Sequence, residues 1–418
     1  MKVLHVAPHL GGGVGKAHSS LVEADAPFIK RHYILLEEPR DRRHADSMKR
    51  SGATLTIAPD FRTIAALAAA ADIVQIEWWN HPRIYHCLCE TVWPAMRSVF
   101  WCHISGLSAP FVPAGLLIAA DRFLFTSACS LAAPNILGLS PQASEKLGVI
   151  NSGFGISARR QYSSENRRPG SVSYLGTVDF SKMSRELFDV IDEAGDDADP
   201  VSIWGSADPS GEVVQAAGEM THPGRVCFMG HSDDPAAVFA ATQVFLYLLE
   251  REHYGTAENA LVEAMSCGCT PLVFANPAEA AIVKDGETGF VVDDARAAAR
   301  RLQWMLRNPE ETRRMGRNAA EDIAATRMPV YSAAAFARVY GALLAGRKRR
   351  HDFGDVLGRT AAEWFVGTQS RDGTLAQMAE LMSFGRPTKG SIDHFLACYP
   401  QDESLSQLLP PNKVAVSG

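Results

Sequence analysis

The chain has 418 residues, of which 46% are hydrophobic and 21% are charged, and its formal net charge is -6. This length indicates two domains rather than one core, and the composition is that of an ordinary globular protein. The acidic balance argues against a general nucleic-acid-binding protein, so we expect no nucleic-acid partner.

The first residues and the cysteines favour a cytoplasmic protein. Residues 1–8 lead directly into a strand-like run, without the basic and apolar regions of a signal peptide. The longest apolar stretch, Ala109–Ala120, is shorter than the ~20 residues that cross a bilayer. The eight cysteines lack the spacing of a zinc site, and we interpret them as reduced thiols.

The first half of the chain alternates between strand and helix patterns. The helical patterns include Ala17–Ala24 and Ile64–Ala71. The predicted strands are residues 2–8, Tyr33–Leu36, Thr54–Ile57, Ile73–Ile76, Val99–Cys102 and Arg122–Phe125. Such alternation predicts a parallel sheet covered by helices on both faces.

The polar stretch Arg159–Gly170 has the composition of a linker, and the alternation restarts after it. The second set of predicted strands is Val172–Leu175, Val201–Trp204, Val226–Met229, Val244–Leu248, Pro271–Phe274 and Phe290–Val292. We therefore expect two doubly wound α/β domains that face a cleft, because open parallel sheets bind ligands beyond the carboxyl ends of their strands.

Helical patterns dominate the last part of the chain. They are Ala295–Arg307, Ser332–Leu344, Thr360–Val366, Leu375–Phe384, Ile392–Cys398 and Ser404–Leu409. The predicted division is residues 1–158 for the first domain, 159–170 for the linker, 171–330 for the second domain and 331–418 for a crossover helix with a helical extension. The basic run Arg347–Arg350 is either a solvated helix end or a peripheral contact with the inner membrane surface.

A glycine-rich loop, Gly11–Gly15, separates the first predicted strand from the first helix. Gly13 and Gly15 would let the backbone approach a phosphate at the helix start. A tight turn explains the loop equally well. Its spacing differs from the G-x-G-x-x-G fingerprint, which argues against a nicotinamide-dependent dehydrogenase.

Two segments of the second half contain charged residues that we expect to face the predicted cleft. Lys182 follows the first strand of this half and would neutralise a diphosphate, although a solvated lysine at a helix start is the simpler reading. Thr256 is the predicted N-cap of a helix that stops at Gly268. Glu263 lies among apolar residues of that helix and needs a partner such as a ribose diol, unless it faces solvent. Glu258 in the first turn suits the helix dipole in any case.

Taken together, Ala260–Gly268 and Ile282–Phe290 resemble the donor-site core of glycosyltransferase family 4, whose members are retaining enzymes of the GT-B fold. Leu175-Gly176 with Lys182 is similar to a second element of that family, and His103 follows a strand where the family often places a histidine. The resemblance weakens outside these segments, covers most of the first 345 residues and ends before Arg347. It implies a GT-B fold with two Rossmann-like domains, to which the helical patterns after Arg347 add a helical C-terminal extension.

The resemblance also implies roles for individual residues. Glu263 would bind the nucleotide ribose, Lys182 would stabilise the departing diphosphate, and His103 would contact the donor sugar or the reacting centre. The segment with Gly255, Thr256 and Asn259 would hold phosphate or sugar hydroxyls at a helix start, and Gly13 and Gly15 would lie beside the diphosphate.

Two positions depart from the family pattern. Thr177 stands where the family has an arginine, and Gly255 stands where it has the first of two glutamates, eight positions before Glu263. Arg185 is a candidate for the missing positive charge, and Glu258 or Glu252 for the missing carboxylate.

The sequence thus predicts a glycosyltransferase that moves a sugar from a nucleoside-diphosphate sugar to a hydroxyl of a glycan, a lipid-linked or a small-molecule acceptor. We expect no metal site and no further cofactor, because leaving-group charge would be met by Lys182 and helix amides. The alternatives are a sugar-nucleotide epimerase or hydrolase of the same fold and a non-catalytic nucleotide- or glycan-binding subunit.

Overall fold

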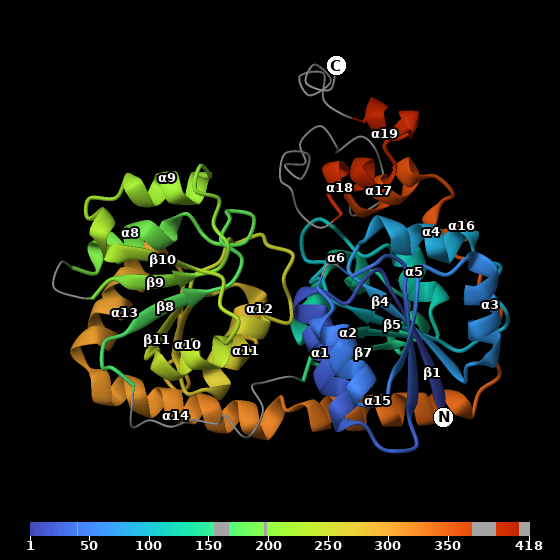
Figure 1. Ribbon diagram of the computed structural model, residues 1–418, viewed down its shortest axis with the longest axis horizontal. Coiled ribbons are helices and arrows are strands. Elements are labelled where there is room, and N and C mark those ends of the chain that lie inside the picture. Colours follow the sequence, from blue (N-terminus) through green and yellow to red (C-terminus); the bar gives the residue numbers. More distant parts are fainter. Residues whose placement is uncertain (40, 154–166, 196–198, 370–389, 409–418) are drawn as a thin grey trace. The chain divides into compact units, whose positions relative to one another are not determined.

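The computed structural model describes residues 1–39, 41–153, 167–195, 199–369 and 390–408 (Figure 1). The chain divides into two compact units. Unit 1 comprises Met1–Gly153 and Pro329–Gly418, and unit 2 comprises Phe154–Met328. Of the predicted linker, residues 159–166 lie outside the described residues.

Unit 1 is built on a seven-stranded parallel sheet with the order β3-β2-β1-β4-β5-β6-β7. Its strands are β1 (Lys2–Ala7), β2 (Lys30–Leu35), β3 (Thr54–Ile57), β4 (Ile73–Trp78), β5 (Ser98–Cys102), β6 (Arg122–Phe125) and β7 (Leu147–Val149). The sheet interior is apolar and aromatic, with Trp78, Trp101 and Phe100 fully buried. The sequence predicted six of these strands; β7 was missed because it is three residues long and half-exposed.

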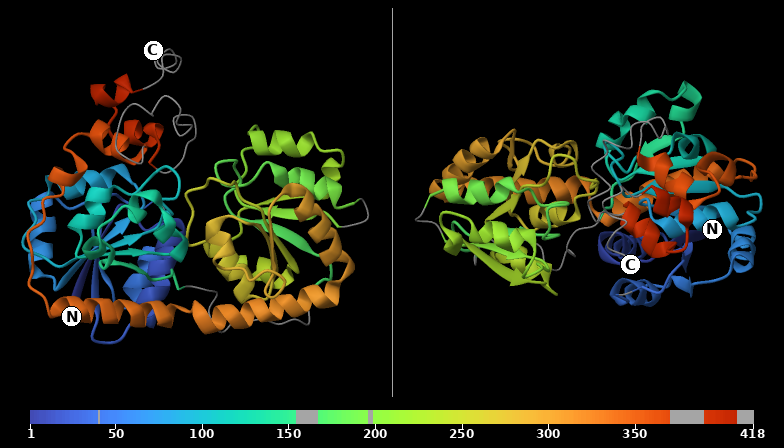
Figure 2. Two further views of the ribbon diagram at one scale, coloured as in Figure 1. Left: turned by 180° about the vertical axis from the view of Figure 1, so that it is seen from behind. Right: turned by 90° about the horizontal axis from the view of Figure 1, so that it is seen from above.

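Helices lie on both faces of this sheet (Figures 1 and 2). They are α1 (Gly12–Ala24), α2 (Arg43–Arg50), α3 (Phe61–Ala70), α4 (Pro82–Glu90), α5 (Ala114–Ala119), the 3-10 turn η1 (Ala128–Ala132), α6 (Pro134–Leu137), α7 (Pro141–Ser144) and α15 (Pro329–Leu344). Side-chain caps begin several of them; Asp60 accepts from the Thr63 backbone N–H at 2.7 Å ahead of α3.

The glycine-rich segment belongs mostly to the first helix. Helix α1 begins at Gly12, so Gly13 and Gly15 lie in its first turn, and the loop predicted up to Gly15 is shorter than expected. A side chain at Gly15 would collide with the backbone carbonyl of Leu10. Gly15 therefore has a packing role, because only glycine lets this helix approach the end of β1 so closely.

The last part of the chain packs on unit 1. Helices α17 (Ala361–Gln369) and α18 (Ile392–Cys398) contact α4, after the short α16 (Gly354–Leu357) and before α19 (Glu403–Gln407). Tyr399 donates its hydroxyl hydrogen to the Pro82 carbonyl at 3.1 Å, and Trp364 stacks on Tyr85. The predicted helix Leu375–Phe384 lies outside the described residues.

Two members of the basic run Arg347–Arg350 are bound to the protein itself. Lys348 donates to the Ala71 carbonyl at 2.7 Å, and Arg349 donates to the Asp121 carboxylate. The run therefore fastens the end of α15 to the sheet, which neither sequence interpretation anticipated. Within the parts of the chain that the structure describes, no helix is both long enough and apolar enough to cross a membrane.

Replacing Asp121 by Asn is expected to lower the free energy of unfolding by about 1–3 kcal/mol. The carboxylate accepts from the Ser98 N–H at 2.8 Å and from Arg349 Nε at 2.7 Å. Burial opposes ionisation, but His351, Ser98 and Arg349 outweigh it and hold the pKa of Asp121 below its usual range. Urea denaturation at pH 7 measures the difference.

A lowered pKa stabilises the fold above the unfolded pKa of about 3.9, and this contribution is lost as the pH falls through the folded pKa. The difference in free energy of unfolding between wild type and D121N should therefore become smaller at acidic pH. Asp355→Asn is the matched control, because its pair with Arg359 is exposed and contributes little. Equal stability of D121N and wild type at pH 7 would contradict this account.

Unit 2 contains a six-stranded parallel sheet with the order β10-β9-β8-β11-β12-β13. Its strands are β8 (Val172–Leu175), β9 (Val201–Trp204), β10 (Val226–Gly230), β11 (Val244–Tyr247), β12 (Thr270–Phe274) and β13 (Phe290–Val292). The helices are α8 (Glu186–Glu193), α9 (Glu212–Gly218), the 3-10 turn η4 (Pro223–Arg225), α10 (Pro235–Ala241), α11 (Asn259–Ser266), α12 (Pro277–Ala280), α13 (Ala295–Arg307) and α14 (Pro309–Thr326). The sequence predicted all six strands.

Helix α14 was not predicted, although it has 18 residues. Its buried stripe consists largely of small or polar residues, among them Thr312, Gly316 and Ala319, so the apolar signal is weak. A side chain at Gly316 would collide with the Gly268 carbonyl.

Arg167, inside the predicted linker, is buried and donates to the carbonyls of Cys267 and Gly268 at the end of α11.

Candidate functional site

The strand order of each sheet reverses at one place, and that is where ligands bind in open α/β sheets. In unit 2 the reversal lies between β8 and β11. The segment after β8 carries Lys182, and the segment after β11 leads to Glu258 at the start of α11. The two segments are joined by backbone hydrogen bonds: Ser184 N–H donates to the Leu248 carbonyl at 3.0 Å, and Glu250 N–H to the Lys182 carbonyl at 2.9 Å.

Lys182 and Glu258 form an ion pair at this position. Lys182 Nζ lies 3.1 Å from Glu258 Oε2, and the two side chains are 18% and 0% exposed. The Tyr247 hydroxyl, at the end of β11, donates to the same oxygen at 2.8 Å. Lys182 is therefore not the solvated lysine of the simpler sequence interpretation, and Glu258 is not a surface residue of a helical turn.

A second pair lies beside the first. His253 Nε2 is 3.0 Å from Glu279 Oε1, and His253 Nδ1 is 3.9 Å from Glu258 Oε1. Glu279 comes from α12 after β12 and is completely buried. We call Lys182, Tyr247, His253, Glu258 and Glu279 the unit 2 cluster.

The electrostatic interactions within this cluster favour the charged forms of Lys182 and Glu258. Burial disfavours charge on Lys182, but the Glu258 carboxylate outweighs it and raises the pKa of Lys182. Burial likewise opposes ionisation of Glu258, yet Lys182 and His253 lower its pKa. Burial raises the pKa of Glu279, while the hydrogen bond to Glu279 overcomes burial and raises the pKa of His253. Lys182 therefore supplies a positive charge beside the His253–Glu279 pair.

Helix α11 begins later than predicted. It starts at Asn259, and Glu258 is the N-cap residue with left-handed backbone angles, φ 39° and ψ 57°. The predicted cap Thr256 was wrong: Thr256 is buried in the preceding segment, three residues before the first helical position. The C-terminal end agrees with prediction, because Gly268 follows the cap Cys267 with φ +81°.

Gly255 and Glu258 are linked by geometry. A side chain at Gly255 would point into the Glu258 carboxylate and collide with its Oε1. Glu258 therefore reaches the space that the side chain of a larger residue 255 would occupy. Glu252, the other proposed substitute, is exposed.

The remaining predicted donor-side residues occupy different settings. Glu263 lies on α11 and is 4% exposed, so the interpretation as a solvated surface glutamate was wrong. Arg185 places its guanidinium 4.1 Å from the centre of the Phe180 ring and pairs with Glu212 on α9, where both side chains are exposed. Its charge is thus paired with Glu212, and its role as the substitute arginine stays a prediction. Thr177 accepts a hydrogen bond from the Tyr174 hydroxyl through its backbone carbonyl.

In unit 1 the strand order reverses between β1 and β4. His103 follows the neighbouring strand β5, and its side chain is 5% exposed. His103 Nε2 lies 3.1 Å from Oε2 of Glu77, a buried residue of β4. Gly13 is exposed in the first turn of α1.

Three groups of histidines and carboxylates among the described residues bring possible metal-ligand atoms within 4.8 Å of one another, which the sequence did not predict. They are His5/His18/Glu77, His9/Glu37/His81 and His253/Glu258/Glu279. Their members come from separate elements, so no short spacing reveals them.

Hydrogen bonds to the histidine rings favour protons over metal ions in these groups. Backbone N–H groups donate to Nδ1 of His9, His81 and His253 at 3.1, 3.2 and 3.0 Å. A ring nitrogen that accepts carries no proton, so the other nitrogen of the neutral ring must carry one and cannot bind a metal. In the remaining group, His5/His18/Glu77, the same restriction applies to His5, because Arg31 Nη1 lies 2.8 Å from His5 Nε2.

Sequence reasoning missed His253, Glu279, His5 and Glu77. His5 and Glu77 had a usable signal, because each is an ionisable residue inside an otherwise apolar strand that is buried on both faces. His253 and Glu279 had none, since each follows a different strand and looks like a loop residue.

Residues 202–322 match the family described as glycosyl transferases group 1. An N-acetyl-alpha-D-glucosaminyl L-malate synthase of Bacillus anthracis is 28% identical over 113 residues, which is 27% of this chain and 29% of that protein. This chain thus aligns with under a third of the length of that curated relative.

Solved structures resemble most of the chain in fold. Anabaena Alr3699/HepE in complex with UDP-glucose has a TM-score of 0.64 and 16% identity, covering 82% of this chain and 100% of that chain. Sucrose-phosphate synthase from Thermosynechococcus elongatus has a TM-score of 0.63 and 18% identity, with coverages of 82% and 100%. With its two parallel sheets, the chain has the two-domain α/β GT-B fold.

Proposed function

We propose that this protein is a glycosyltransferase that moves a sugar from a nucleoside-diphosphate sugar to an acceptor hydroxyl, with retention of configuration at the anomeric carbon. The observation that carries the proposal is the buried Lys182–Glu258 pair at the reversal point of unit 2, within reach of the start of α11. The family match over residues 202–322 supports it. Retention is proposed from the resemblance to glycosyltransferase family 4.

The demanding step is departure of the nucleoside diphosphate. The bond between the anomeric carbon and the phosphate oxygen breaks, its electron pair stays on the phosphate, and the sugar becomes oxocarbenium-like. The acceptor oxygen then bonds to the same carbon, and its proton passes to the departing diphosphate. Lys182 would meet the developing phosphate charge, with Glu258 holding its ammonium group in position. Backbone N–H groups at the start of α11 would add to this stabilisation.

The donor would be held by Glu263, whose buried carboxylate suits the two hydroxyls of a ribose. Thr256, Asn259 and the Gly255 backbone would contact phosphate or sugar hydroxyls. We propose that no metal ion takes part, which is supported by the ring nitrogens of His9, His81 and His253 that accept backbone hydrogen bonds. In unit 1, His103 would contact a sugar or acceptor hydroxyl.

A donor screen tests this proposal. The purified protein is mixed with UDP-, GDP- and ADP-sugars, beginning with UDP-glucose, and thermal unfolding is recorded. A donor at 100 times its dissociation constant stabilises the fold by about 2.7 kcal/mol, enough to raise the melting temperature by several degrees.

Turnover separates the alternatives. Release of nucleoside diphosphate that depends on an acceptor supports a transferase, and release without any acceptor indicates a hydrolase. Binding of a donor with no release across a broad panel of acceptors would instead support a non-catalytic subunit. No stabilisation by any nucleotide sugar would contradict the proposal as a whole.

A further inference from the structure

A groove in unit 2 lies between helix α10 and the strands β8 and β9, and it encloses a cavity of about 480 Å³. Ligand-binding cavities of proteins commonly have volumes of roughly 300–1,000 Å³. Among the described residues, neither Lys182 nor Glu258 lines this cavity, so it is separate from the unit 2 cluster. We call it the Ser202 groove, and the lining residues that matter most are Arg168, Ser173, Asp199, Ser202, Trp204 and Asp234.

Small residues create the Ser202 groove. Ser173 of β8 and Ser202 of β9 are register partners in adjacent parallel strands, at positions that are normally apolar in a sheet covered on both faces. Helix α10 contributes Ala237 and Ala241 to the wall. The edge strand β10, next to β9, is exposed from Cys227 to Gly230, so this end of the sheet is incompletely covered. The two serines and two alanines leave space that larger apolar side chains would fill.

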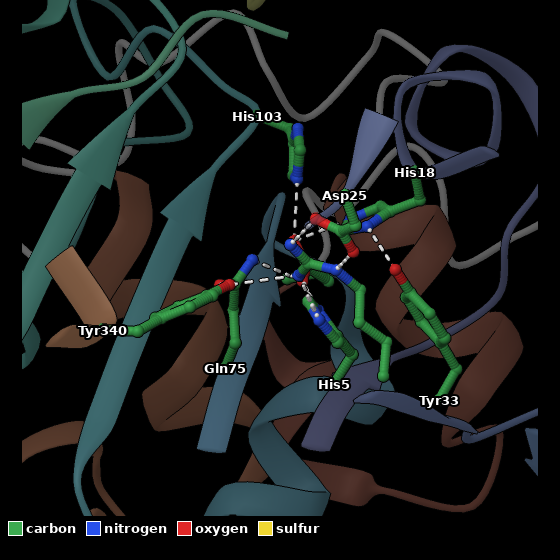
Figure 3. A network of polar contacts seen from close by, with 9 residues as sticks. His5, His18, Asp25, Tyr33, Gln75, His103 and Tyr340 are labelled. Atoms are coloured by element: carbon green, nitrogen blue, oxygen red, sulfur yellow. Dashed lines mark hydrogen bonds and ion pairs between the residues drawn. The ribbon is translucent and has the colours of Figure 1, made fainter. Parts of the chain in front are cut away.

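Buried polar side chains do not by themselves indicate a ligand, as the interior of unit 1 shows (Figure 3). There Arg31 donates to Asp25 at 2.9 Å and to the Tyr340 hydroxyl at 3.1 Å. That hydroxyl donates in turn to the side-chain oxygen of Gln75 at 2.5 Å, so these groups satisfy one another. Ser202 differs, because it is partly exposed on the wall of a cavity that is open to solvent. Its hydroxyl is therefore accessible to a molecule from solution.

The charges of the groove argue against an anionic ligand. Arg168 is the cationic residue of the lining, and Asp199 and Asp234 are the anionic ones, which gives a formal net charge of -1. Arg168 Nη2 lies 2.6 Å from Asp199 Oδ2, so the two charges are paired. A phosphate or a fatty-acid carboxylate would thus enter a site whose positive charge is already neutralised, which disfavours nucleotides and acyl anions.

The chemistry of the wall favours a ligand that is both polar and apolar. Ser173, Ser202 and Ser232 place hydroxyls along the wall, and an apolar molecule would remove water from them without replacing its hydrogen bonds. Trp204 and Val238 contribute apolar surface beside these hydroxyls. A sugar matches this mixture, because a pyranose ring has apolar C–H faces and a rim of hydroxyls that both donate and accept. We propose that the Ser202 groove binds an oligosaccharide.

The groove is long enough for a chain of sugars. It extends from Arg168 and Asp199, which precede β8 and β9, to Trp204, the last residue of β9. The four residues of β9 span about 13 Å, which exceeds one pyranose ring. The Gly176 N–H donates to the Trp204 carbonyl at 3.0 Å, so the Trp204 end lies beside the segment that leads to Lys182. We therefore assign the bound chain to the acceptor or the product of sugar transfer. That assignment rests on the proposed function, whereas oligosaccharide binding does not.

Oligosaccharide binding can be measured without any donor. Maltotetraose, cellotetraose and chitotetraose are each titrated into the purified protein, and saturation-transfer difference NMR gives the dissociation constants. We expect at least one of the three to bind, and saturating UDP to leave its affinity unchanged. Failure of all three to bind, or displacement of the bound tetrasaccharide by UDP, would overturn the proposal. Binding of dodecanoate in place of every tetrasaccharide would identify a site for apolar anions and would also overturn it.

Two variants test the position of the binding site. Trp204→Ala removes the aromatic surface, and Ser202→Leu fills the cavity with an apolar side chain, so each should weaken tetrasaccharide binding at least tenfold. S202L adds apolar contact beside α10 and should fold, which keeps the test decisive if W204A does not. Ser144→Leu, the same change at an exposed position of unit 1, is the matched control and should bind like wild type. Wild-type affinity in folded S202L would overturn the proposal.

Sugar transfer is measured separately from binding. S202L and W204A should raise the KM for a tetrasaccharide acceptor at least tenfold and leave the KM for the corresponding monosaccharide unchanged, because only the chain reaches the groove. A general structural defect would raise both KM values alike and would contradict the acceptor assignment. Absence of transfer by the wild-type protein, together with tetrasaccharide binding that S202L abolishes, would reject the proposed function and retain the groove.

Discussion

Replacing Lys182 by Met should reduce kcat for sugar transfer on the order of 100- to 1,000-fold, the loss seen when one preorganised group that stabilises transition-state charge is removed. Methionine keeps most of the length of the side chain and removes only the ammonium group, which lies 3.1 Å from Glu258. The departing diphosphate would then develop negative charge without the Lys182 ammonium group to stabilise it. Initial rates of nucleoside diphosphate release at saturating donor measure this effect.

A loss of fold must be distinguished from a loss of catalysis. K182M leaves the Glu258 carboxylate buried without its ammonium partner, and breaking such a pair costs about 3–5 kcal/mol when both groups are deeply buried. Lys182 is partly exposed, so water replaces some of the lost interaction. The double variant K182M/E258Q removes both charges and should recover stability while remaining inactive. Activity of K182M within threefold of wild type would rule out the proposed role.

Lys182→Arg is the matched charge-conserving variant. A guanidinium keeps the charge but spreads it over a planar fork, which does not fit a site shaped for a compact ammonium group. We expect intermediate activity, above that of K182M and below wild type. Equal activity of K182R and K182M would mean that charge at this position does not matter.

The sequence predicted the two sheets well because parallel strands are continuous apolar runs between polar turns. The bounds of β6 and β9 were predicted to the residue, since each is a short run of that kind. Helix α14 was missed for the opposite reason, because Gly316 and Ala319 face the core without a strong hydrophobic signal.

The candidate site was only partly accessible from sequence. Lys182 and Glu258 were named separately, but their pairing depends on β8 and β11 being neighbours in the sheet, and strand order is not written in any local pattern. The start of α11 was misplaced because Thr256 is the better capping residue by type, whereas tertiary contacts hold Glu258 in the left-handed conformation at that position. Glu77 required the fold as well, since its three histidines come from three different segments.

The second large effect concerns the carboxylate at the start of α11. Glu258→Gly should lower kcat about 100-fold, because Lys182 loses the group that holds it and Tyr247 loses its acceptor. Glycine suits the backbone angle of φ 39° at this position, so relief of about 1 kcal/mol of strain offsets part of the lost hydrogen bonding. Sugar transfer and urea denaturation of E258G measure the two contributions separately.

Gly255→Glu in the E258G background should then restore activity at least tenfold. A side chain at position 255 points into the space that the Glu258 carboxylate occupies in the wild-type protein, and E258G removes that collision. The ring of His253 must also shift, because a Cβ at position 255 would lie 2.8 Å from its Nδ1. The control G255A/E258G adds the Cβ without the carboxylate and should stay as inactive as E258G. Gly255→Glu alone should be destabilised, because two carboxylates would compete for one position beside a single ammonium group. Recovery by the alanine control as much as by the glutamate would show that packing, and not the charge opposite Lys182, is what Glu258 contributes.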